Sequence, residues 1–442
     1  MLIGFAERDI TPIGDKIMPG DFWPIEATEE PHGRLLVTAA AFTSGDESVI
    51  LVSMDILSSL CEYADKLRER ISEATGVPFS NILVAAIHTH TGPLIEYDVW
   101  TTPASPETAA RTADLTVEAA IAAWEARAEA KLGVGKTKEI RYSFNRDFYM
   151  TDGRVIMNPG INHRHEIVRH AGGVDHSVDV MRVDDMDGNI KCFIVNYANH
   201  PDCYYIPSKK AYSADFPGYM RRALKAHYGE DVKVLFFNGT AGNINCIDFV
   251  DETSNSYYCE EVESAPQVIG EALAEDIIAL NPKIKTDETD ADIKVIDRKH
   301  NTPRRFKTQE HIEWAKKVIA NPNAKFDDRT YAEEYLSDAE VGLSKEIPIE
   351  VHTIKLGPWA ITGLPGEIYT EIGIKIKAAS PFEHTLVFEL ANGTHGYIAP
   401  AYMVDSGVYE SRLSQKNSCT DRTTADMLVK KALEHLNEIA GK

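Results

Sequence analysis

The sequence predicts a mixed α+β fold, with layered β-sheets flanked by helices, in a single large domain over residues 1–442. Short apolar runs typical of strands alternate along the chain with longer segments of helical periodicity. A composition of 43% hydrophobic and 26% charged residues is typical of a globular protein with a full core. We find no internal repeat and no low-complexity tract, so neither a solenoid nor a disordered chain is expected.

The predicted strands are apolar runs, rich in β-branched or aromatic residues, that are too short to be helices. The turn Ser44-Gly45-Asp46 joins the first two strands, and the run 347–356 alternates like a strand with one exposed face. In chain order the predicted strands are 35–42, 49–55, 82–87, 192–198, 232–237, 347–356, 359–364 and 385–391.

The predicted helices carry apolar residues at helical spacing, with charged residues on the other face. The first one ends at Gly76, because glycine readily adopts the left-handed conformation that closes many helices. The highly charged stretch 299–346 is predicted to be a helical insertion within the domain, and the long segment 392–420 a functional loop. In chain order the predicted helices are 60–75, 106–130, 217–228, 309–319, 331–340, 368–378 and 421–439.

The charge balance excludes two classes of partner. With a net charge of -22, the surface repels phosphate backbones and anionic lipid headgroups, so we expect a small-molecule substrate and no nucleic-acid partner. No run approaches the roughly 20 apolar residues of a membrane helix, so we expect no membrane insertion. The oligomeric state stays open, a homo-oligomer included.

The N-terminus and the cysteines predict a cytoplasmic protein. No basic segment followed by an apolar stretch opens the chain, so we expect no signal peptide. The six cysteines are scattered and form no Cys-x-x-Cys pair, so we expect free thiols in a reducing compartment. They are Cys61, Cys192, Cys203, Cys246, Cys259 and Cys419.

The most informative motif is Ile87-His88-Thr89-His90-Thr91-Gly92-Pro93, which places two histidines at the end of an apolar run. In an extended chain, residues i and i+2 point to the same side, so we expect the two imidazoles side by side at a strand end. Paired imidazoles are typical zinc ligands, or one ligand beside one acid–base group. The alternative is that one or both only cap the strand through hydrogen bonds.

The same pattern recurs downstream, where polar residues directly follow apolar strands. His200 follows the strand 192–198, and Glu367 follows the strand 359–364. Strand ends at one edge of an α/β sheet converge on a shared crevice, and two histidines with a carboxylate form a plausible catalytic zinc set. Taken singly, His200 is more typical of a structural hydrogen-bonding histidine, and Glu367 equally of a carboxylate favoured by a helix N-terminus.

A series of short motifs in a fixed order extends this pattern over most of the chain. It resembles the N-terminal catalytic domain of the neutral/alkaline non-lysosomal ceramidase family. The motifs are Asp9-Ile10-Thr11-Pro12, His88-Thr89-His90-Thr91-Gly92-Pro93, Asn145-Arg146, Asn199-His200-Pro201, Ser213-Ala214-Asp215-Phe216-Pro217-Gly218, Ala241-Gly242-Asn243-Ile244-Asn245, Pro365-Gly366-Glu367 and Gly396-Tyr397.

The resemblance implies a Zn²⁺ site and cleavage of an amide bond. By position, His88 and His200 would be the imidazole ligands of the zinc, Glu367 its carboxylate ligand and Tyr397 its phenolic ligand. Zinc lowers the pKa of a bound water to roughly 7 and polarises the carbonyl under attack.

The resemblance also implies catalytic residues around the metal. His90 would stand beside the zinc, either to carry a proton to the leaving amine or to orient the substrate, while Arg146 or Tyr409 would stabilise the carbonyl oxygen. Two alternatives stay open, since Arg146 could form a surface ion pair with Asp147, and Tyr409 could be an ordinary loop aromatic.

The chain departs from the family at one site position. Ceramide-cleaving members carry Gly-Asp-Val-Ser-Pro where this chain has Gly242-Asn243-Ile244-Asn245-Cys246, so Asn245 replaces a serine proposed to be catalytic. An amide cannot serve as that nucleophile, so we expect either direct attack by activated water or a substrate-orienting role for Asn245. Together with the acidic surface and the missing export signal, this predicts a small soluble amide, such as an N-acyl amino sugar or N-acyl amino acid, rather than ceramide.

The leading hypothesis is therefore a zinc-dependent amidohydrolase acting on linear amides. A zinc-dependent esterase or lactonase is the first alternative, and a non-catalytic ligand-binding relative is the second. The intact set of candidate ligands speaks against the second alternative.

Overall fold

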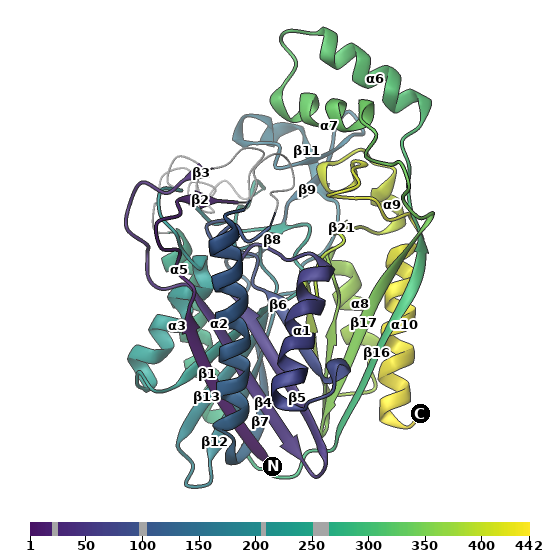
Figure 1. Cartoon of the computed structure of the whole chain (residues 1–442). Coiled ribbons are helices and arrows are strands. Elements are labelled where there is room, and N and C mark those ends of the chain that lie inside the picture. The colour runs from purple at the N-terminus through teal and green to yellow at the C-terminus, as the bar shows by residue number, and fades with distance from the viewer. Residues whose placement is uncertain (20–24, 97–103, 205–208, 251–264) are drawn as a thin grey trace.

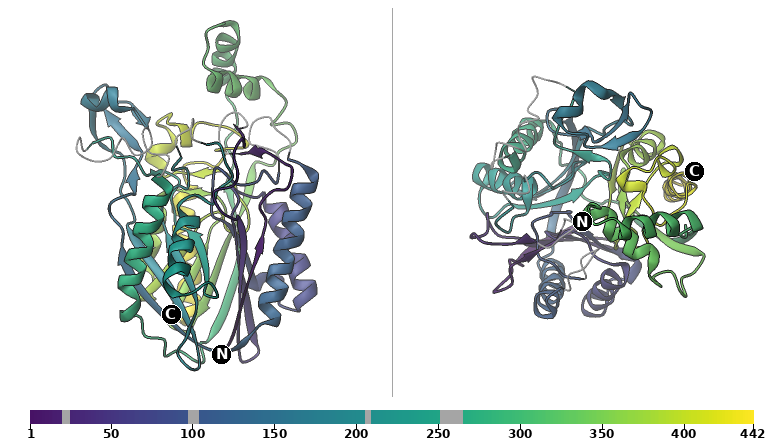
Figure 2. Two further views of the ribbon diagram at one scale, coloured as in Figure 1. Left: turned by 90° about the vertical axis from the view of Figure 1, so that its left-hand side faces the viewer. Right: turned by 90° about the horizontal axis from the view of Figure 1, so that it is seen from above.

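The computed structural model describes residues 1–19, 25–96, 104–204, 209–250 and 265–442 (Figure 1). It confirms the predicted mixed α+β class: two β-sheets stack face to face, and helices cover their outer sides (Figure 2). None of the described helices is both long and apolar enough to cross a membrane. Cys61, Cys192, Cys203, Cys246 and Cys419 are free thiols as predicted, and Cys259 lies outside the described residues.

The larger sheet has eight strands. They are β1 (Leu2–Asp9), β4 (Leu36–Ser44), β5 (Glu47–Met54), β6 (Ile82–Ala86), β7 (Ala128–Lys138), β12 (Ser177–Asp185), β13 (Ile190–Tyr197) and β14 (Lys233–Asn238). Their order is β14-β13-β12-β7-β1-β4-β5-β6, and only the outer pairs β13–β14 and β5–β6 are parallel. These parallel pairs end in the loops that carry His200 and His88.

The smaller sheet has four strands in the order β16 (Ile293–Pro303), β17 (Glu346–Leu356), β18 (Trp359–Gly363) and β20 (His384–Phe388). Its inner face packs against the larger sheet through a shared apolar core. At the centre of this core, Phe237 of β14 stacks on Phe388 of β20, with ring centroids 4.3 Å apart. The two sheets therefore fix the relative positions of the loops at their ends.

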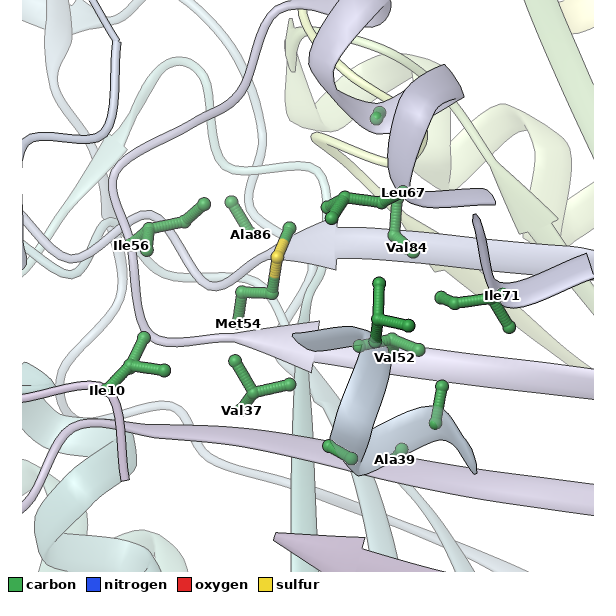
Figure 3. Packing of buried hydrophobic residues seen from close by; sticks show 14 of the residues in the cluster. Ile10, Val37, Ala39, Val52, Met54, Ile56, Leu67, Ile71, Val84 and Ala86 are labelled. Atoms are coloured by element: carbon green, nitrogen blue, oxygen red, sulfur yellow. The ribbon is translucent and has the colours of Figure 1, made fainter. Parts of the chain in front are cut away.

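Pairs of helices close the outer faces. α1 (Cys61–Thr75) and α2 (Pro106–Glu125) cover β4, β5 and β6, where Val52 and Val84 meet Leu67 and Ile71 (Figure 3). Two helices, α3 (Asp215–Tyr228) and α5 (Ala265–Leu280), cover β13 and β14. Two others, α8 (Thr370–Ala379) and α10 (Thr424–Ala440), cover the smaller sheet.

The remaining elements lie at the upper end of the molecule in Figure 1. Helices α6 (Gln309–Ala320) and α7 (Phe326–Leu336) project there between β16 and β17 (Figure 2). The short elements are β2 (Ile17–Met18), β3 (Ile25–Glu26), β8 (Phe144–Asn145), β9 (Asp147–Met150), β10 (Val155–Met157), β11 (Ile167–His170), β15 (Ile244–Asn245), β19 (Glu367–Ile368), β21 (Tyr397–Ile398) and α9 (Ala401–Val404).

Three predicted elements have a boundary that is wrong by four residues or more. The helix expected over 106–130 ends at Glu125, because Ala128 and Glu129 pair with β1 and sheet pairing outweighs the helix propensity of alanine. The expected insertion 299–346 begins too early, since residues 299–303 belong to β16 and pair with β17. The helix expected over 331–340 runs instead from Phe326 to Leu336.

Candidate functional site

A sharp turn, and not an extended strand, brings His88 and His90 together. Strand β6 ends at Ala86, and His88 has a φ of 73°, in the left-handed region that residues other than glycine rarely adopt. Two bonds hold it there: its backbone N–H donates to Ile56 (3.1 Å), and its Nδ1–H donates to the Leu57 carbonyl (2.9 Å). The predicted extended geometry is therefore wrong, but the predicted proximity is right, with ring centroids 5.0 Å apart.

Three histidine side chains converge at this turn. The Nε2 of His200 lies 3.0 Å from Nε2 of His88 and 3.1 Å from Nε2 of His90. His200 follows β13, and its Nδ1–H donates to the Ala241 carbonyl at 3.2 Å. Because carbonyls only accept, His88 and His200 both carry a ring proton on Nδ1 and turn their Nε2 atoms toward each other. Two Nε2 lone pairs at this distance repel unless a proton or a metal ion lies between them, and a backbone carbonyl on Nδ1 is the usual support of a metal-bound histidine.

Glu367 brings a carboxylate to the same point. Its Oε2 is buried and lies 3.2 Å from Nε2 of His88. Burial opposes ionisation, but a positive charge on His88 and the Tyr397 hydroxyl hold the pKa of Glu367 below its usual range, and Glu367 in turn raises the pKa of His88. Burial also holds the pKa of His200 well below its usual range, so His200 stays neutral. A neutral imidazole and an ionised carboxylate are the forms that bind a metal.

Tyr397 lies next to Glu367 because β19 and β21 pair in parallel, with these two residues in register. Its hydroxyl accepts a hydrogen bond from Nη2 of Arg146 at 3.1 Å, and its ring lies 5.6 Å from that of Tyr409. The four residues predicted as metal ligands are thus drawn together from two loops and two short strands, and the donor set of two imidazoles, a carboxylate and a phenol fits zinc.

His90 has different surroundings from the other two histidines. Its Nδ1 faces a carboxylate, that of Asp202, at 3.6 Å, and Asp202 is itself paired with Nζ of Lys209 at 2.6 Å. Burial, together with the charges of His88 and Lys209, lowers the pKa of His90 to about 4. His90 is therefore a neutral base at pH 7, oriented by an acid in the way that proton-transferring histidines often are.

Arg146 is buried inside the site and is not a surface residue. Its Nε donates to Oε1 of Glu410 at 2.6 Å, while Asp147 instead accepts from the Tyr369 hydroxyl at 2.9 Å. The alternative of a surface ion pair between Arg146 and Asp147 is therefore wrong. Burial lowers the pKa of Arg146, but the carboxylate of Glu410 outweighs this effect and holds the pKa of Arg146 well above its usual value. The guanidinium therefore keeps its charge at any physiological pH.

Asn245 lies in the β15–β8 pair, with both ends of its amide engaged by protein. Its Nδ2 donates to Oδ1 of Asn158 at 2.6 Å, and its Oδ1 accepts from the N–H of Ile247 at 3.1 Å. A substrate-orienting role for Asn245 stays a prediction.

Three acidic residues of the site were not predicted from the sequence: Asp202, Glu410 and Glu389. Glu389 is fully buried and accepts from the N–H groups of Ala241 and Ile368, both at 3.0 Å. It thereby ties the loop that supports His200 to the strand that carries Glu367, and burial raises its pKa to about 8. A glutamate inside the apolar run 385–391 was the signal that could have identified it.

A second group of Asp297, Glu350 and His352 also brings potential metal-binding atoms together. The fully buried Arg68 already supplies a cation there, with Nη2 at 2.6 Å from Asp297 and Nη1 at 3.0 Å from Glu350. This group is therefore an ion-pair network that ties α1 to β16 and β17, and not a second metal centre.

Comparison with known proteins identifies the fold. No protein-family model matches the sequence, and no curated protein matches it significantly. The crystal structure of the neutral ceramidase from Pseudomonas aeruginosa superposes with a TM-score of 0.73 at 15% sequence identity, covering 99% of this chain and 74% of that one. A ceramidase complexed with C2 gives a TM-score of 0.74 at 14% identity, covering 100% and 75%. The chain thus has a neutral ceramidase-like fold, as the motifs predicted.

Proposed function

We propose that this chain is a zinc-dependent hydrolase that cleaves the C–N bond of a small N-acyl substrate with activated water. The observation that carries the proposal is the meeting of Nε2 of His88 and Nε2 of His200 with the buried Oε2 of Glu367. These residues and Tyr397 would hold the metal. When bound, zinc supplies a water whose pKa is lowered to roughly 7 and a Lewis acid for the scissile carbonyl.

The chain's own residues supply the proton transfers and the charge stabilisation. His90, neutral and oriented by Asp202, accepts a proton at one ring nitrogen and delivers it to the leaving amine. Arg146, fixed by Glu410, and the Tyr409 hydroxyl donate to the carbonyl oxygen as negative charge develops on it. Fixed donors in a buried site need no reorganisation during the reaction.

Three observations support a small soluble amide as the substrate class. The fold is shared with ceramidases, whose name denotes cleavage of an amide. Asn245 replaces the serine of the ceramide-cleaving motif, and the net charge of -22 disfavours docking on anionic membranes. A cytoplasmic location stays a prediction, and an ester or lactone substrate stays the alternative.

The test is hydrolysis of matched amides and esters by the purified, zinc-loaded protein. We expect turnover of soluble N-acetyl amides, loss of that turnover after chelation, and its return on adding Zn²⁺. Short-chain ceramide in detergent micelles is the comparison substrate, and we expect it to react more slowly. Turnover confined to esters would support the alternative, and metal-independent turnover would contradict the proposed mechanism.

A further inference from the structure

A cavity of about 320 Å³, a volume suited to a small ligand, is lined by residues of the loops that carry the proposed metal site. Leu57, whose carbonyl accepts from His88, lines it, as does Pro93 in the turn after His90. Lys416 also lines it, and the neighbouring Asn417 carbonyl accepts from the Tyr397 N–H at 2.7 Å.

The lining of the cavity combines apolar residues with two cations. Leu57, Pro93 and Ile95 are among the apolar lining residues, and the cations are Arg304 and Lys416. His395 also lines the cavity. Burial and the charge of Arg304 lower the pKa of His395 to about 4, so this side chain is polar but uncharged at pH 7.

The two cations have no acidic partner among the described residues. Arg304 donates only to neutral acceptors, from Nε to the Ser344 carbonyl at 2.9 Å and from Nη1 to Gln415 at 3.0 Å and Cys419. Glu96, the acid among the lining residues, is engaged by the N–H of Leu60 at the start of α1. In a chain with 68 acidic and 46 basic residues, two cations left unpaired at one cavity mark a place for an anion.

We propose that this cavity holds the amine half of the substrate, and that the substrate is an N-acyl amino acid with an apolar side chain. Its carboxylate binds Arg304 and Lys416, and its side chain packs against Leu57, Pro93 and Ile95. An amino acid carries both features on one carbon, which matches a small cavity lined by both apolar residues and cations. This inference rests on the proposed function: water's hydroxyl goes to the acyl carbon, the C–N bond breaks, and the amine takes the proton.

The first test measures binding without turnover. In isothermal titration calorimetry, 4-methylpentanoate carries the apolar chain and the carboxylate but no amide bond, and 4-methylpentan-1-ol is its uncharged counterpart. We expect the zinc-loaded protein to bind the carboxylate about tenfold or more tightly than the alcohol. The double variant R304Q/K416Q should lose this difference, R304K should retain most of it, and K317Q, which removes an exposed lysine of α6, should leave it unchanged.

The result that would overturn the inference is equal binding of 4-methylpentanoate by R304Q/K416Q and by the natural protein. The carboxylate would then sit on the metal or elsewhere. Absence of binding to the natural protein would overturn it as well.

The second test separates this inference from the proposed function. The substrates are N-acetyl-L-leucine and its neutral relative N-acetyl-L-leucinamide. We expect the natural protein to hydrolyse the acid with a kcat/KM about tenfold higher than that for the amide. In R304Q/K416Q this preference should disappear because KM for the acid rises, while kcat is maintained. Hydrolysis without any preference for the acid would contradict the inference and leave the proposed function intact. Carboxylate binding that depends on Arg304 and Lys416, without hydrolysis of either compound, would support the cavity and contradict the proposed function.

Discussion

The buried ion pair between Arg146 and Glu410 makes the sharpest stability prediction. Its atoms lie 2.6 Å apart, and the two side chains are 8% and 0% exposed. The substitution Glu410→Gln keeps the shape of the side chain but removes its charge. It leaves the guanidinium in a low-dielectric interior, where the neutral Tyr397 hydroxyl at 3.1 Å is the other partner. Breaking a buried pair in this way typically costs about 3–5 kcal/mol.

This cost corresponds to a measurable fall in Tm. At about 2.1 cal/mol/K per residue, unfolding of 442 residues has an entropy of about 0.9 kcal/mol/K, so we expect Tm to fall by about 3–5 °C. Differential scanning calorimetry measures it directly. The control is Glu438→Gln, which breaks a pair of similar length (2.7 Å to Arg298) whose side chains are about half exposed, and which should change Tm by less than about 1 °C. Equal shifts for the two variants would refute the reasoning.

Two further predictions concern the site and its support. A Cβ on Gly242 would lie 2.7 Å from the Glu367 carbonyl oxygen, so the substitution Gly242→Ala should displace β19. We expect it to weaken zinc binding, measured by competition with a chromogenic chelator. An unchanged affinity for zinc would contradict this prediction. Burial raises the pKa of the Asp215 carboxyl to about 7, whereas it is about 3.9 in unfolded chains. Because the folded state therefore binds the proton more tightly, the contribution of Asp215 to stability is complete below pH ~4 and is lost as the pH rises to ~7. Urea unfolding should therefore show that Asp215→Asn gains stability relative to the natural protein between pH 5 and 7; parallel curves would count against the shift.

Strands that are apolar along nearly their whole length were predicted from the sequence. Elements whose apolar residues are interrupted by charges, or show no clear helical periodicity, were missed. β5 and β6 are apolar nearly throughout and were placed within a few residues. β12 was missed because charged residues interrupt it; Asp179, buried within it, is matched by Lys377 of α8, a partner that sequence spacing does not reveal. α5 was missed because it is apolar on most sides, which obscures helical periodicity.

The candidate site residues that belong to short sequence motifs were predicted, and those that only tertiary contacts bring to the site were missed. His88, His200, Glu367 and Tyr397 stand directly after strands or in recognisable motifs, and the structure draws them together. Asp202, Glu389 and Glu410 act through residues far away in the chain, so their roles follow from tertiary contacts alone. The prediction that His88 and His90 lie close together was right, but its reason was wrong, because a left-handed turn at His88 replaces the expected extended strand.

The zinc content of four purified proteins tests the central claim most directly. Inductively coupled plasma mass spectrometry of the natural protein and of His88→Ala, His200→Ala and His90→Ala would be compared at equal protein concentration. The account predicts about one zinc ion per chain in the natural protein and in His90→Ala, and loss of zinc in the other two variants. Zinc retained by His88→Ala and His200→Ala, or lost from His90→Ala to the same degree, would contradict it.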